Sequence, residues 1–102
     1  MKVLVVCQRG NSRSSSLAYI LKDGYGHDAI AIGLESNGEE VKELLYNWAE
    51  KIILVDNRFV SQIPEKYKSK LKIWDVGPDR FFLGVVPELM QLYQDYMKNN
   101  PL

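Results

Sequence analysis

The stretch that decides the fold is MKVLVVCQRGNSRSSSLAYIL, residues 1–21. Residues 3–6 are apolar and mostly β-branched, which predicts a short buried strand. Leucine and isoleucine then recur across residues 17–21 with the i, i+3, i+4 spacing of a helix, which we expect to start near Ser14. A polar loop, residues 7–13, joins the two. The first twenty residues therefore predict a strand, a loop and a helix.

The rest of the chain repeats this alternation. Apolar runs at residues 29–34, 51–55 and 71–74 each predict a strand, and segments with helical spacing separate them. Such alternation is typical of an α/β domain with a parallel sheet, right-handed crossovers and helices on both faces. We therefore expect one domain, residues 1–102, with three layers around a four-stranded parallel sheet.

Each later helix has a pattern of its own. Ser36 and Glu39 have the spacing of a capping box, which predicts that Ser36 caps the second helix. The predicted buried face of that helix consists of Val41, Leu44, Leu45 and Trp48. A short helix is expected around residues 57–62, followed by an exposed lysine-rich connection. The last helix is expected from near Val86, with Pro87 in its first turn. Its predicted inner face consists of Val86, Leu89, Met90, Tyr93 and Met97.

Composition narrows the class of protein. With 46% hydrophobic and 25% charged residues, the chain is typical of a globular protein. Its 13 basic and 13 acidic residues balance, so we expect neither a nucleic-acid nor a membrane partner. No apolar run approaches the roughly 18 residues of a membrane span, and the first strand is too short for a signal sequence. The single cysteine excludes an internal disulfide and favours a cytoplasmic location, where a free thiol stays reduced.

The loop after the first strand has the residues of an oxyanion site. Cys7 supplies a nucleophilic sulfur, Arg13 a guanidinium that can bind two phosphate oxygens, and Ser14 a hydroxyl for the sulfur. Backbone N–H groups and a helix N-terminus would surround the bound anion. The expected phosphate-binding residues are Gln8, Arg9, Gly10, Asn11, Ser12, Arg13 and Ser14. A phosphate or another oxyanion is therefore the expected ligand.

A second polar loop is expected at the same edge of the sheet. Cys7 ends the first strand and Asp75 follows the fourth, and the carboxyl ends of parallel strands share one edge. Attack of a thiolate on a phosphomonoester also needs a proton donor for the leaving oxygen, and residues 7–13 contain no acid. The donor must therefore come from elsewhere on this edge, where Asp75 and Asp79 are the candidates.

With these features the chain resembles the low-molecular-weight protein tyrosine phosphatases, and more closely their short predicted relatives. The segments that carry the resemblance are Val5-Val6-Cys7 to Arg13-Ser14, Asn47-Trp48-Ala49 to Asp56, and Asp75-Val76-Gly77-Pro78-Asp79 followed by Pro87-Glu88-Leu89. The resemblance implies the strand order 2-1-3-4 and hydrolysis of phosphomonoesters through a cysteinyl-phosphate, with no metal or other cofactor. The implied substrates are proteins phosphorylated on tyrosine, or small phosphomonoesters.

The resemblance also implies roles for single residues. Cys7 would be the nucleophile, Arg13 the phosphate clamp, and a loop aspartate the acid that later activates water. Asp79 is preferred to Asp75, because aromatic residues follow it as they follow the acid of the family. Apart from the resemblance, the apolar residues Phe81, Phe82 and Leu83 are expected to form the wall of the substrate pocket or an exposed docking patch.

Departures from the family pattern leave other functions open. Gly10 and Asn11 lie one position later than in the family, and Ser12 stands where a second cysteine is usual. The pattern Cys7-x-x-Gly10-x-Ser12-x-Ser14 also resembles the phosphocysteine loop of sugar phosphotransferase IIB components. Those phosphocarriers need neither an acid nor a loop arginine. A non-catalytic phosphate-binding module is the third alternative.

Overall fold

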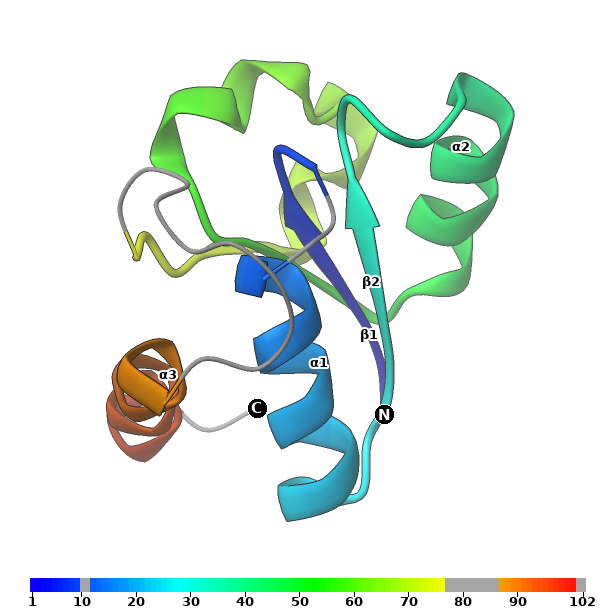
Figure 1. Ribbon diagram of the computed structural model, residues 1–102. Helices are drawn as coiled ribbons and strands as arrows, with labels where there is room; N and C mark the ends of the chain where they lie inside the picture. Colours follow the sequence, from blue (N-terminus) through cyan, green and yellow to red (C-terminus); the bar gives the residue numbers. More distant parts are fainter. Residues whose placement is uncertain (10–11, 77–86, 101–102) are drawn as a thin grey trace.

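The computed structural model in Figure 1 describes residues 1–9, 12–76 and 87–100. Its strands are β1 (Lys2–Cys7), β2 (Asp28–Gly33), β3 (Lys51–Leu54) and β4 (Leu71–Ile73). All are parallel and lie in the order β2-β1-β3-β4. Its helices are α1 (Ser12–Tyr25), α2 (Glu39–Trp48) and α3 (Pro87–Asn99), with 3-10 helices η1 (Asn57–Gln62) and η2 (Glu65–Lys70). The expected fold, a four-stranded parallel sheet of order 2-1-3-4 flanked by helices, is confirmed.

Strand β1 is buried on both faces because a helical layer covers each side of the sheet. Val3 and Val5 belong to the core under α1 and α3, whereas Leu4 and Val6 belong to the core under α2 and the 3-10 helices. This division follows from the alternation of side chains along a strand. In Figure 1, α1 and α3 lie on one side of the sheet and α2 on the other. The central position of β1 in the sheet thus explains why residues 3–6 form a continuous apolar run.

The predicted capping box of the second helix is wrong. Helix α2 begins at Glu39, its N-cap is Gly38, and no side chain caps it. Ser36 lies outside the helix, and its Oγ donates to the backbone oxygen of Arg9 at 2.7 Å. Ser36 therefore hydrogen-bonds to the loop after β1 and does not cap α2.

The predicted buried face of α2 is wrong in part. Val41 is 46% exposed and Leu44 is 69% exposed, while Lys42 and Tyr46 are the buried residues of the helix. Only Leu45 and Trp48 of the predicted face pack partly against the core. Lys42 can lie inside because its Nζ reaches the backbone oxygen of Leu34 at 3.1 Å.

The remaining helices agree more closely with the prediction. The short helix at residues 57–62 is confirmed as η1, and α3 buries Leu89, Tyr93 and Met97 as expected. Met90 packs partly against the same core, whereas Val86 lies outside the described residues. The connection predicted to be exposed instead forms η2 and buries Tyr67.

Within the described ranges, no helix combines the length and apolar character needed to cross a membrane.

Candidate functional site

The nucleophile candidate lies where β1 meets α1. Cys7 is the last residue of β1, and its side chain is buried. The Cys7 thiol donates a hydrogen bond to Ser14 Oγ at 3.1 Å, and Ser14 is itself fully buried. If the thiol ionises, the rotatable hydroxyl of Ser14 can donate to the sulfur instead. The structure thus brings Cys7 and Ser14 together.

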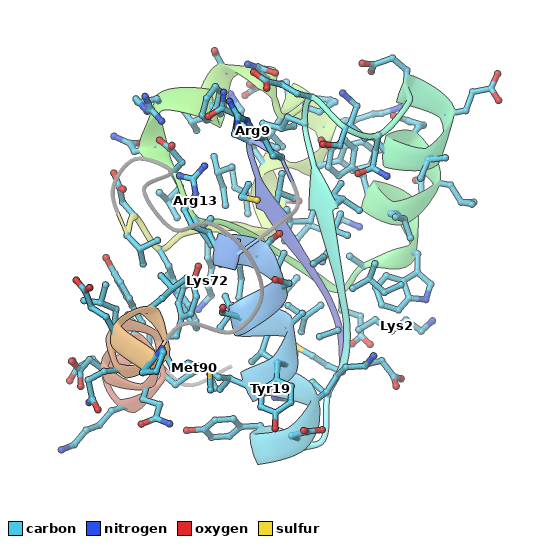
Figure 2. The ribbon with its side chains drawn as sticks, in the orientation of Figure 1. Lys2, Arg9, Arg13, Tyr19, Lys72 and Met90 are labelled. Carbon is cyan, nitrogen blue, oxygen red and sulfur yellow. The ribbon has the colours of Figure 1, made fainter. Side chains whose placement is uncertain are left out.

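Arg13 points into the molecule and forms a buried ion pair. Its side chain is 0% exposed, and its Nη1 donates to Asp56 Oδ2 at 2.7 Å. Asp56 follows β3, which pairs with β1, so both residues lie at the carboxyl edge of the sheet. Figure 2 places Arg13 and Arg9 at this edge and Lys2 at the opposite end of β1. A charged donor is therefore fixed next to the loop that starts at Cys7.

A second and more exposed arginine, Arg58, also pairs with Asp56. Arg58 Nη2 lies 2.6 Å from Asp56 Oδ2, and Arg58 Nε lies 3.0 Å from Asp56 Oδ1. The backbone N–H of Arg58 also donates to Oδ1, so Asp56 is the N-cap of η1. Neither Asp56 nor Arg58 received a role from the sequence. The usable signal was an aspartate directly after the buried run 51–55, on the edge that also carries Cys7.

These contacts decide the charge of Asp56. Burial by itself raises the pKa of this carboxyl, but the hydrogen bonds from Arg58 and Arg13 together outweigh burial and lower the pKa to about 2. Asp56 is therefore a carboxylate at neutral pH. It suits the role of counter-ion for two guanidinium groups and not that of proton donor.

The β2–α2 connection contacts the start of the loop that follows β1. Gln8 Nε2 donates to Glu35 Oε1 at 2.9 Å, and the backbone N–H of Glu35 donates to the oxygen of Gln8 at 2.9 Å. With the bond from Ser36 to Arg9, these contacts hold the backbone oxygens of Gln8 and Arg9. Ser12 is the first residue of α1. The other two predicted phosphate-binding residues, Gly10 and Asn11, lie outside the described residues.

Of the two candidate acids, the structure describes Asp75. It is exposed and follows β4 at the same edge as Cys7, and its backbone oxygen accepts a hydrogen bond from Tyr96 Oη at 2.8 Å. The buried Trp74 stacks on the Tyr96 ring with centroids 5.6 Å apart. Outside the described residues lie Asp79, Phe81 and Phe82, so their predicted roles stay predictions.

Helix α3 also contacts the candidate site, at Arg13. Tyr93 is fully buried, and its Oη donates to the backbone oxygen of Arg13 at 2.6 Å. Burial raises the pKa of the Tyr93 hydroxyl, so the group remains a donor at neutral pH. The same helix thus contacts the first turn of α1 through Tyr93 and the segment after β4 through Tyr96.

The described residues contain no group of three or more histidine, cysteine, aspartate or glutamate side chains that could hold a metal ion.

Comparison with known proteins assigns no family to the chain. No family model, no curated protein and no solved structure matches it. Function is therefore inferred from the arrangement of Cys7, Arg13, Ser14 and Asp56.

Proposed function

We propose that the chain is a phosphomonoesterase of the low-molecular-weight protein tyrosine phosphatase type, acting through a cysteinyl-phosphate at Cys7. The observation that carries the proposal is the site at the β1–α1 junction. Cys7 Sγ is hydrogen-bonded to Ser14 there, and the neighbouring Arg13 is held by the buried carboxylate of Asp56. A thiol, a hydroxyl and a guanidinium at one helix N-terminus are groups that nucleophilic attack on a phosphomonoester can use.

In the first step, the Cys7 thiolate attacks phosphorus and the ester oxygen leaves. Arg13 binds the equatorial oxygens through N–H groups of its guanidinium. The leaving oxygen takes a proton from Asp79, with Asp75 as the alternative acid. In the second step, the resulting carboxylate takes a proton from water, which attacks the phosphocysteine. Inorganic phosphate and the Cys7 thiolate are the products, and the aspartate is protonated again.

The test is hydrolysis of p-nitrophenyl phosphate by wild type, Cys7→Ser, Asp79→Asn and the control Lys2→Ala, which lies at the opposite end of β1. Wild type and Lys2→Ala should turn the substrate over, and Cys7→Ser should be inactive. The rate of Asp79→Asn should fall by about 10² or more. Because p-nitrophenolate leaves without a proton, Asp79→Asn should still form phosphocysteine and accumulate it, which mass spectrometry detects.

Other outcomes would point to the alternatives. If Asp75→Asn is the more damaging change, Asp75 is the acid. If wild type does not hydrolyse the ester but Cys7 is labelled by a phosphotransfer partner, the chain is a phosphocarrier. If it binds inorganic phosphate with neither turnover nor labelling, it is a binding module.

A further inference from the structure

Three charged side chains, Arg13, Asp56 and Arg58, contact one another in series from the protein interior to the surface. The Arg13 side chain is 0% exposed and that of Asp56 is 2% exposed, whereas the Arg58 side chain is 58% exposed. Asp56 Oδ2 accepts from both guanidinium groups, at 2.7 Å from Arg13 Nη1 and 2.6 Å from Arg58 Nη2. The Asp56 carboxylate is thus shared by the exposed and the buried arginine.

Arg58 restrains this carboxylate more fully than Arg13 does. Its backbone N–H and its Nε both donate to Oδ1 at 3.0 Å, while its Nη2 donates to Oδ2. Donors on both oxygens prevent rotation of the carboxylate plane, which is otherwise a soft torsion. The guanidinium of Arg58 also lies over the Phe59 ring, 5.2 Å from its centroid, and this contact limits its own movement.

Loss of Arg58 would change the position of Arg13. The Asp56 carboxylate could turn about its side-chain torsion, and the Arg13 guanidinium that it orients would lose a defined position. Arg13 would then bind a phosphoryl group less well.

We propose that Arg58 is a positioning residue of the oxyanion site, orienting the Arg13 guanidinium through the Asp56 carboxylate. The inference rests on the proposed function, in which Arg13 binds the phosphoryl group. It assigns to the exposed arginine of η1 a part in substrate affinity without contact with the substrate.

The kinetic test compares Arg58→Ala and Arg58→Lys with wild type and with Lys2→Ala, which removes the same charge at the opposite edge of the sheet. Arg58→Ala should raise the KM for p-nitrophenyl phosphate and the inhibition constant of inorganic phosphate by about tenfold, the effect expected if Arg13 loses one charge-assisted hydrogen bond to the phosphoryl group. Its kcat should change much less. Lysine should restore part of the affinity, and Lys2→Ala should behave as wild type.

The path through Asp56 is tested by a double-mutant cycle. In an Asp56→Asn background, Arg58→Ala should add little further loss of phosphate affinity, because the group that couples the two arginines is already altered. An undiminished tenfold effect in that background would show that Arg58 contacts the ligand directly and would overturn the proposal. A folded Arg58→Ala variant with wild-type phosphate affinity would overturn it as well.

A spectroscopic measurement separates this inference from the proposed function. Nitrogen-15 NMR of the Arg13 side chain reports guanidinium rotation whether or not the chain hydrolyses anything. Wild type and Lys2→Ala should give resolved Nη signals, and in Arg58→Ala these should broaden or merge. Unchanged Arg13 signals in Arg58→Ala would refute the positioning role. If wild type has no activity and binds no phosphate, the proposed function fails while this spectrum still tests the positioning of Arg13.

Discussion

At the scale of single residues, buried polar side chains gather at one edge of the sheet. Arg13, Ser14 and Asp56 lie there among residues that are otherwise apolar. Burying a charge is costly unless a partner with good geometry offsets the lost hydration. The short contacts between Asp56 and its two arginines provide that compensation. The sequence identified Arg13 and Ser14 from their place in the loop, but the partner of Arg13 comes from a segment 43 positions away.

The Asp56 carboxyl should make stability depend on acid pH. Its pKa is about 2 in the folded protein, below the ordinary 3.8. Its contribution is therefore complete above about pH 4 and is lost as the pH falls toward 2. We expect a loss of about 2 kcal/mol in the free energy of unfolding from this group between pH 5 and pH 2. Urea unfolding across this pH range measures it.

Asp56→Asn should lack this part of the acid dependence and should be less stable than wild type at pH 7, because Arg13 loses its counter-ion. The control Asp23→Asn makes the same chemical change at an exposed position of α1 and should retain the dependence. Identical pH profiles for the two variants would contradict the role given to Asp56.

At the scale of elements, α2 illustrates where a sequence pattern stops being informative. The i, i+3, i+4, i+7 pattern correctly predicted a helix, but two residues of its predicted buried face, Val41 and Leu44, are exposed. Both sides of α2 carry large side chains, and the burial of Tyr46 depends on Tyr67 of η2, whose ring lies 5.2 Å away. Since η2 was expected to be an exposed connection, the contact that orients the helix could not be foreseen.

A pair of alanine substitutions tests the orientation of α2. Tyr46→Ala should lower the free energy of unfolding by about 3 kcal/mol or more, as is usual for a buried aromatic side chain. Leu44→Ala should change it by less than about 0.5 kcal/mol, because Leu44 is mostly exposed. Chemical denaturation of both variants measures the difference. A larger cost for Leu44→Ala would restore the face that the sequence predicted.

At the scale of the whole molecule, α3 joins the two loops of the candidate site. Tyr93 reaches the backbone of Arg13 across 80 residues of sequence, and Tyr96 reaches Asp75. The periodicity of α3 predicted its buried residues correctly, including Tyr93. It could not indicate that the Tyr93 hydroxyl would end at the first turn of α1, because a hydrogen-bond partner depends on how the layers dock.

Removal of single hydroxyls tests this connection. Tyr93→Phe should lower the free energy of unfolding by about 1 to 2 kcal/mol, since it leaves the buried oxygen of Arg13 without this donor, and should weaken phosphate binding. The matched variant Tyr96→Phe should cost less, because its hydrogen bond to Asp75 is exposed and water can replace it. Equal effects of the two variants on stability and on phosphate affinity would argue against a special role for Tyr93.

The sequence by itself determined the strands, the helices α1, α2, η1 and α3, their alternation and the parallel sheet, because apolar periodicity and strand–helix alternation act locally along the chain. It also indicated the loop from Cys7 to Arg13. Only the tertiary structure decided which face of α2 is buried and which groups meet at the carboxyl edge. The ion pair of Arg13 with Asp56 and the hydrogen bond from Tyr93 to Arg13 join residues far apart in sequence. Such contacts depend on the register of the strands and on how the helices pack on the sheet. No local sequence pattern predicts either of these.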